Sequence, residues 1–184
     1  MDGDNYRFIS DIILDDSDQY KIYDQGEVCW TCTWVRVFGC FAPETTLLLA
    51  NGEEKAISDI RKGDFVWNPV TEKAVEVEFV MESAEAEPLI EIVTINGKSL
   101  KVTQKHPIQT KAGLKVASDL KLGDSVEVSN GDFEQIVSVE NLEVQNSQTV
   151  YNLMLNADSD DLDDHMVLAD GVVAGDQYAQ ESLK

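Results

Sequence analysis

A ten-residue pattern that occurs twice, 60 positions apart, constrains the fold of this chain more than any other feature. Residues 57–66 read Ile-Ser-Asp-Ile-Arg-Lys-Gly-Asp-Phe-Val, and residues 117–126 read Ala-Ser-Asp-Leu-Lys-Leu-Gly-Asp-Ser-Val. Both copies place Ser-Asp before an aliphatic and a basic residue, and end in Gly-Asp with Val two positions on. Such self-similarity indicates duplication of a structural unit. We therefore expect two related halves of about 60 residues, each with a Gly-Asp turn that leads into a strand.

The stretch from residue 45 to 155 consists of short runs that favour β-strands, and several of them alternate apolar with polar residues. Turn signals separate the runs, the clearest being Asn51-Gly52, Asn96-Gly97 and Asn130-Gly131. The pattern predicts an all-β domain, with helix only in the acidic segment before Cys40. The predicted strands are Thr45–Leu49, Phe65–Trp67, Val75–Met81, Leu89–Ile95, Ser99–Thr103, Ile108–Thr110, Ser125–Val128, Gln135–Leu142 and Thr149–Leu155.

The charge of the chain narrows its partners without naming a function. Its 184 residues hold 14 Lys and Arg against 35 Asp and Glu, a formal net charge of −21. This balance argues against nucleic acid, whose binding needs cations that displace counterions, and against anionic membranes. No apolar run approaches the ~18–20 residues of a membrane helix. The N-terminus does not read as a signal peptide, which leaves a cytoplasmic location or a place within a larger secreted protein.

The distribution of charged residues along the sequence suggests three segments. Residues 1–39 carry three basic and eight acidic residues, and residues 156–176 carry seven Asp and no Lys or Arg. We expect an acidic upstream flank at 1–39, one compact domain at 40–176 and a short C-terminal flank at 177–184. The acidic stretches are then the solvated edges of that domain.

Two residues of this domain stand out chemically. Cys40 opens it directly after Gly39, and His106 stands where the run ending at Thr103 enters a turn before Pro107. A lone cysteine beside aromatic residues is commonly a small buried apolar side chain, and a histidine in such a place is commonly part of the core. A cysteine nucleophile with a histidine that moves protons is the alternative.

Four motifs, in order and spacing, decide between these interpretations. They are Cys40-Phe41 with the residues from Thr45 to Val66, Thr103-Gln104-Lys105-His106, Val150-Tyr151-Asn152-Leu153, and Ala169-Asp170-Gly171-Val172-Val173. Together they resemble the motifs of the Hint superfamily, which comprises inteins, bacterial intein-like domains and the autoprocessing half of Hedgehog proteins. The resemblance covers residues 40–176 and implies the Hint fold, a horseshoe-shaped β domain with pseudo-two-fold symmetry.

The resemblance also implies a self-processing reaction at the Gly39–Cys40 bond. Cys40 would attack the Gly39 carbonyl and convert the peptide into a thioester by an N-to-S acyl shift. His106, expected to titrate near neutrality, would give a proton to the Cys40 nitrogen, and Thr103 would hold the scissile amide. Gly39 permits a strained peptide and close approach of the thiol because it has no β-carbon. The substrate is then the chain's own flanking polypeptide, and water or a small thiol or amine is the nucleophile.

The C-terminal end departs from splicing inteins, which finish in His-Asn before Cys, Ser or Thr. Here Gly175-Asp176-Gln177 stand at those positions, so a carboxylate replaces the amide that would cyclise and the acceptor nucleophile is absent. We expect N-terminal cleavage, weak or no cleavage after Asp176, and little or no splicing. His165 falls near the last motif and could assist, although a solvated histidine is the simpler interpretation. A Hedgehog-like sterol transfer is disfavoured because residues 177–184 show no sterol-recognition region.

Two further signals and one competing function remain. Cys29 and Cys32 form a C-x-x-C motif. One of them could form a disulfide with Cys40 that keeps the chain unreactive until it is reduced, or both could be reduced thiols. The acidic run Asp158–Asp164 lacks the pattern of a calcium-binding loop and is interpreted as solvated. We expect no metal and no cofactor. The competing function is a Hint-fold remnant that no longer reacts and serves as a structural or binding module.

Overall fold

The computed structural model describes residues 39–129, 131–143 and 147–183, together with the backbone of three short strands that precede them. The chain forms two compact units, Met1–Val37 and Phe38–Lys184. In the first unit β1 (Ile12–Leu14), β2 (Tyr20–Asp24) and β3 (Glu27–Val28) pair in the order β1-β2-β3. The expectation of helix in this acidic segment is wrong for these three stretches, because β-branched and aromatic residues within them pair as strands.

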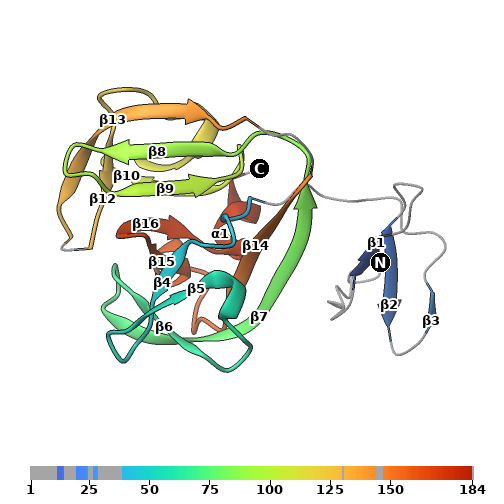
Figure 1. Cartoon of the computed structure of the whole chain (residues 1–184). Coiled ribbons are helices and arrows are strands. Elements are labelled where there is room, and N and C mark those ends of the chain that lie inside the picture. The colour runs from blue at the N-terminus through green and yellow to red at the C-terminus, as the bar shows by residue number, and fades with distance from the viewer. Residues whose placement is uncertain are drawn as a thin grey trace, which may run out of the picture. The chain divides into compact units, whose positions relative to one another are not determined.

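The second unit is almost entirely β (Figure 1), and every strand predicted between residues 45 and 155 is present. A long ribbon of β7 and β14 runs antiparallel beside the main sheet. The strands are β4 (Thr46–Leu48), β5 (Glu54–Ala56), β6 (Phe65–Asn68), β7 (Lys73–Glu85), β8 (Ile90–Thr94), β9 (Ser99–Val102), β10 (Pro107–Thr110), β11 (Gly113–Val116), β12 (Ser125–Glu127), β13 (Phe133–Asn141), β14 (Gln148–Leu155), β15 (Met166–Ala169) and β16 (Val172–Gly175).

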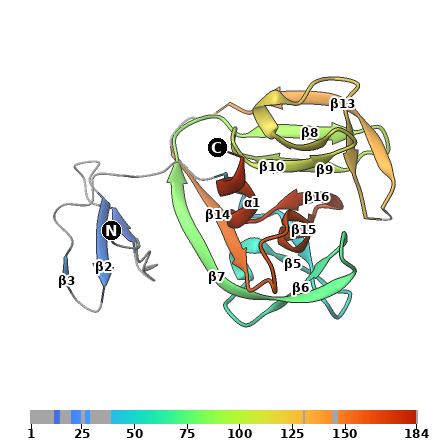
Figure 2. The same ribbon diagram turned by 180° about the vertical axis from the view of Figure 1, so that it is seen from behind.

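The strands pair into two sheets. The larger follows the order β5-β4-β15-β16-β10-β12-β13-β8-β9, with β11 paired to β10, and the smaller follows β14-β7-β6. Seen from behind in Figure 2, β15 and β16 cross the middle of the unit, with the β8–β9 layer on one side and β5 and β6 on the other. Residue 41 links the sheets, since Phe41 bridges both Val102 and Tyr151. The residue next to Cys40 therefore lies where the two sheets meet.

The predicted duplication is confirmed at the level of single hydrogen bonds. The 3₁₀ turns Ile57–Asp59 and Ala117–Asp119 occupy equivalent places, and Gly63 and Gly123 adopt φ values of 88° and 91°. Equivalent ion pairs close the two turns, 2.7 Å from Lys55 Nζ to the Asp64 carboxylate in the first half and 3.1 Å from Lys115 Nζ to that of Asp124 in the second. Each of these pairs of positions differs by 60, the offset of the sequence repeat.

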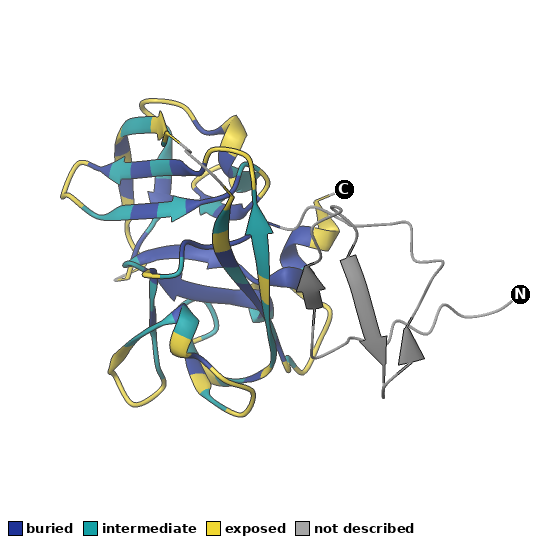
Figure 3. Ribbon diagram, turned by 45° about the vertical axis from the view of Figure 1, so that its right-hand side comes forward, coloured by how far each residue is buried: buried dark blue, intermediate teal, exposed yellow. Residues whose placement is uncertain are grey.

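The core is apolar and lies under both halves. β15 and β16 are buried along their whole length (Figure 3), as expected for strands covered on both faces. Their connection is the two-residue turn Asp170-Gly171, in which both residues have positive φ (47° and 78°), as Asp-Gly hairpin turns require. This tight turn brings residues 166–175 back across the core and places residue 176 beside β14.

One α-helix closes the unit, α1 (Gln177–Ser182), which the strand pattern did not predict. Asp176 caps its N-terminus, because one carboxylate oxygen accepts a hydrogen bond from the Ala179 backbone N–H at 3.0 Å. Six residues are too few to show helical periodicity in the sequence. A helix this short is not stable by itself, so tertiary contacts with β14 and β16 stabilise it. No helix in the part of the chain that the structure describes has the length and apolarity needed to cross a membrane.

Candidate functional site

Cys40 is held between the end of β9 and the middle of β14. The backbone N–H of Phe41 donates to the Tyr151 carbonyl at 2.7 Å, and the N–H of Thr103 donates to the Cys40 carbonyl at 2.9 Å. The Cys40 side chain is only 2% exposed. Its sulfur lies 4.0 Å from Ser83 Oγ on β7. The cysteine is therefore fixed in a buried position with defined backbone neighbours.

Thr103 contacts the amide nitrogen of Cys40. The Cys40 N–H donates a 2.7 Å hydrogen bond to Thr103 Oγ1 across 63 residues of sequence. Both residues are buried, so no solvent competes for this bond. The structure thus joins the two predicted site residues through the nitrogen of the Gly39–Cys40 peptide.

His106 is fully buried against the same peptide. Its ring centroid lies 4.0 Å from that of Phe41, and among the described residues neither ring nitrogen has a hydrogen-bond partner. Burial lowers the pKa of His106 to about 3, with the Gly39 backbone opposing the shift in part. The expectation that His106 titrates near neutrality is therefore wrong for the folded, uncleaved chain, because burial disfavours the imidazolium.

Burial also governs Cys40. It raises the pKa of the Cys40 thiol to about 12, with the Ser83 hydrogen bond acting in the lowering direction and Glu85 in the raising one. At neutral pH the thiol is protonated and the imidazole is neutral. Transfer of a proton from the thiol to the imidazole would create a buried thiolate and imidazolium, and burial makes such charges costly.

The carbonyl side of the same peptide has a partner that the sequence analysis missed. Asn152 Nδ2 on β14 donates a 2.6 Å hydrogen bond to the Gly39 carbonyl oxygen, and Asn152 is fully buried. The sequence held one indication of this contact. Asn152 follows Val150 by two positions on the predicted strand, so both side chains lie on its buried face. Such a buried amide needs partners, and here one partner is the Gly39 carbonyl.

Gly39 packs closely on His106. A β-carbon at residue 39 would lie 2.6 Å from His106 Cα and 2.8 Å from its backbone nitrogen. The missing side chain thus permits this close approach of the two backbones.

The C-terminal residues form a second buried group. His165 Nδ1 lies 3.0 Å from Asp176 Oδ2, and the His165 ring stacks on Tyr178 with centroids 4.0 Å apart. His165 is 5% exposed, so its interpretation as a solvated histidine is wrong. Burial acts to lower the pKa of His165, but the hydrogen bond and charge of Asp176 outweigh it and hold that pKa above its ordinary value.

Asp176 occupies a position built for two acceptor oxygens. Oδ1 accepts from the Ala179 N–H, and Oδ2 accepts from the Leu155 N–H at 2.9 Å as well as facing His165. An asparagine amide has one acceptor oxygen and could satisfy only one of these backbone donors. The carboxylate at residue 176 therefore fits its surroundings better than an amide would.

Two further features were predicted from the sequence, the Cys29 and Cys32 pair and the acidic run Asp158–Asp164. Cys29 and Cys32 fall outside the described residues. In the acidic run, Asp161 caps the 3₁₀ turn Leu162–His165 and Ser159 Oγ donates to Asp164. Across the described ranges no three His, Cys, Asp or Glu side chains are arranged to hold a metal ion.

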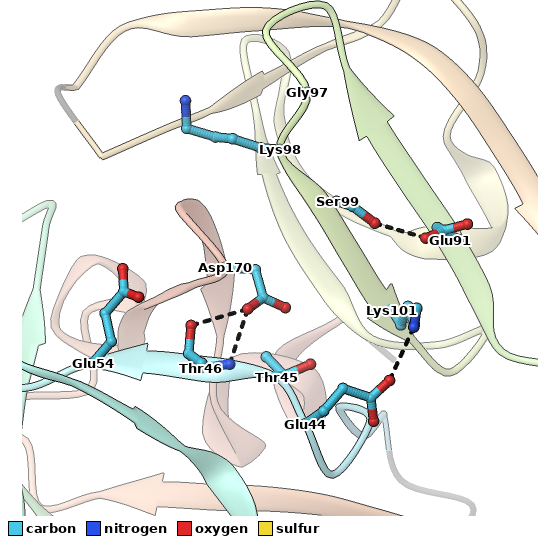
Figure 4. Close-up of a pocket in the computed structure, with 10 residues that line it drawn as sticks. All are labelled: Glu44, Thr45, Thr46, Glu54, Glu91, Gly97, Lys98, Ser99, Lys101 and Asp170. Carbon is cyan, nitrogen blue, oxygen red and sulfur yellow. Dashed lines mark hydrogen bonds and ion pairs between the residues drawn. The ribbon is translucent and has the colours of Figure 1, made fainter.

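A cavity of about 450 Å³ lies between β4, the β15–β16 turn and the β8–β9 hairpin (Figure 4), and neither Cys40 nor His106 lines it. Several of its charged groups are occupied by their neighbours. Asp170 accepts from the backbone and hydroxyl of Thr46, and Lys101 pairs with Glu44 at 3.0 Å. The cavity is lined by neither cysteine nor histidine.

Comparison with known proteins gives a family match and several similar structures. A family model described as a Hint-domain, Vint, matches residues 39–175. Among solved structures, the gp41-1 intein superposes with a TM-score of 0.63 at 22% identity, covering 75% of this chain and 98% of the intein. The DnaB intein of Synechocystis sp. PCC 6803 superposes with a TM-score of 0.62 at 20% identity, and the match covers 75% of this chain and 98% of the intein.

A third similar structure is the bacterial intein-like domain of Clostridium thermocellum, with a TM-score of 0.64 and 24% identity. The match covers 74% of this chain and 98% of that domain. These structures support the fold. One curated protein, DNA-directed RNA polymerase III subunit rpc2 of Dictyostelium discoideum, is 30% identical over 95 residues. The match spans 47% of this chain and 6% of that subunit, so it says nothing of transcription by this chain.

Proposed function

The chain belongs to the Hint-domain family, whose fold is that of self-processing domains, and from this membership we propose that it breaks its own Gly39–Cys40 peptide bond. The observation that carries the proposal is that this peptide is held on both sides. Asn152 donates to the Gly39 carbonyl oxygen at 2.6 Å, and Thr103 accepts from the Cys40 nitrogen at 2.7 Å. A buried peptide needs a partner for each of these two atoms, and here both partners are side chains able to act in a reaction.

In the proposed reaction the Cys40 sulfur attacks the Gly39 carbonyl carbon. A C–S bond forms, the C–N bond to Cys40 breaks, and the thiol proton ends on the Cys40 nitrogen. Neutral His106 accepts that proton and returns it to the nitrogen. Asn152 stabilises the negative charge that develops on the carbonyl oxygen, and Thr103 orients the amide.

The thioester then reacts with water or with a small thiol or amine. Water yields a carboxylate at Gly39 and restores the Cys40 thiol, now beside a free α-amine. The chain's upstream polypeptide is the substrate and leaves as the acyl product. We propose no splicing, because Gln177 has no hydroxyl or thiol nucleophile, and Asp176 has no side-chain amide to cyclise and caps α1.

A second candidate function is a Hint-fold module that no longer reacts. The observation that favours it is burial, because Cys40 is 2% and His106 0% exposed and both are uncharged at neutral pH. Such a domain would retain the fold and serve as a structural or binding element.

Hydroxylamine separates the two functions, since it captures a thioester as a hydroxamate. The chain is incubated with hydroxylamine and its intact mass is followed, with Cys40→Ala and His106→Gln as variants. We expect a 1–39 hydroxamate fragment from the parent, none from Cys40→Ala and much less from His106→Gln. A full-length parent after days, with native Cys40 still open to alkylation after unfolding, would support the unreactive module.

A further inference from the structure

Two glutamines of α1 are buried although nothing in the proposed reaction uses them. Gln177 is 0% and Gln180 6% exposed. Both point their side-chain oxygens at one group, with Asn152 Nδ2 lying 3.0 Å from Gln177 Oε1 and 3.4 Å from Gln180 Oε1. A buried amide is stable only with such partners. The same Nδ2 is the donor to the Gly39 carbonyl.

The contacts define which way the Asn152 amide faces. Its oxygen accepts from the Leu153 N–H at 2.8 Å, and its two N–H groups face Gly39, Gln177 and, at the longer distance of 3.4 Å, Gln180. An amide turned over by 180° would set its oxygen against both acceptors and its NH₂ group against the Leu153 N–H. Gln177 therefore disfavours the orientation in which Asn152 cannot donate to the carbonyl.

Gln177 is itself oriented by a neighbour one helical turn away. Its Nε2 donates to Glu181 Oε1 at 3.0 Å, which leaves Oε1 as the atom that faces Asn152. A chain of directed hydrogen bonds thus runs from Glu181 through Gln177 and Asn152 to the Gly39 carbonyl. The segment after Asp176 is in this way connected to the bond before Cys40.

We propose that Gln177 is a positioning residue for the acyl shift, which holds the Asn152 amide on the Gly39 carbonyl while Glu181 orients Gln177. The inference rests on the proposed function for its effect on rate. It assigns α1 a role beyond covering the core. The position that follows Asp176 contributes a hydrogen-bond acceptor to the N-terminal reaction.

The first test measures hydroxylamine-dependent cleavage in Gln177→Ala. We expect cleavage about tenfold slower than in the parent, the effect of losing one buried hydrogen bond that positions a catalytic group. The double variant Gln177→Glu with Glu181→Gln exchanges acceptor and donor along the same chain of bonds and should regain most of the rate. Ser182→Ala, on the same helix but bonded only to the Tyr178 carbonyl, should match the parent.

A residue that acts through Asn152 should have no effect without it. Adding Gln177→Ala to Asn152→Ala should therefore slow cleavage no further than Asn152→Ala alone. Independent effects that multiply would overturn the proposal.

A second readout does not depend on the reaction. In a Cys40→Ala background, with ¹³C at the Gly39 carbonyl, the infrared stretch of that carbonyl should move to higher frequency when Gln177→Ala is added, and return with the exchanged pair. An unchanged frequency together with a parental cleavage rate would overturn the proposal. If the parent itself is not cleaved, the acyl shift fails as a function, while the carbonyl frequency still decides whether Gln177 positions Asn152.

Discussion

Asn152 Nδ2 and the carbonyl oxygen of Gly39 are joined by a 2.6 Å hydrogen bond, although 113 positions separate the two residues in the chain. The bond is buried, and it meets the carbonyl whose carbon Cys40 is proposed to attack. A donor already in place on that oxygen needs no reorganisation when negative charge develops there. This relationship makes Asn152 a part of the proposed reaction.

Removal of the donor should slow the reaction strongly. We expect Asn152→Ala to reduce hydroxylamine-dependent cleavage by about 10²–10³-fold, the usual effect of losing one oxyanion donor. Intact mass over time gives the rate. Asn156→Ala, one position beyond the end of the same strand and exposed, serves as the control. A parental rate in Asn152→Ala would assign the bond to folding alone.

A methyl group on residue 39 should displace the scissile peptide. In Gly39→Ala the new β-carbon would lie 2.6 Å from His106 Cα, so backbone atoms must shift. A displacement approaching 1 Å costs about 100-fold in rate, which is the loss of cleavage we expect. Gly113→Ala is the matched control, since it meets nothing within 4 Å but has φ of +101°. It should lower the free energy of unfolding and leave the cleavage rate unchanged.

The His165–Asp176 pair predicts how stability changes with pH. The pKa of His165 is raised in the folded state above its ordinary 6.5, so folding favours the protonated ring. The resulting stabilisation is complete below pH 6.5 and is lost as the pH rises through the raised pKa. Urea unfolding of the parent should show this fall in the free energy of unfolding.

His165→Gln is the comparison for that experiment, because it removes the titrating ring. The difference between parent and variant should shrink as the pH rises across this window. The contribution of His106, whose pKa is lowered to about 3 in the folded state, is the same in both chains and cancels in the difference. A difference that is constant with pH would contradict the assignment.

Restoring an asparagine at residue 176 should not restore C-terminal cleavage. Asp176→Asn leaves either the Ala179 or the Leu155 N–H without its acceptor. We expect a loss of about 1–3 kcal/mol in the free energy of unfolding and no fragment ending at residue 176. Asp170→Asn is the matched control, because Asp170 uses a single oxygen for both of its bonds to Thr46. Release of residues 177–184 from Asp176→Asn would show that an amide alone suffices.

The fold could be predicted from local sequence because its strands and turns are repeated. The pattern at residues 57–66 returns at 117–126, and the structure repeats the same 3₁₀ turn, glycine conformation and ion pair at each copy. β5, β11 and β15 were missed because their few residues lack clear alternation. α1 was missed because six residues cannot show helical periodicity.

The sequence by itself determined the two halves, the order of the main strands and the motifs that contain Cys40, Thr103 and His106. These follow from residue types at short spacing, where periodicity and turn chemistry act. Only the tertiary structure decided that Asn152 meets Gly39, that Gln177 meets Asn152, and that Asp176 is a buried helix cap paired with His165. Strand pairing between distant segments creates these contacts, and burial then sets the protonation of Cys40 and His106, which no local pattern encodes.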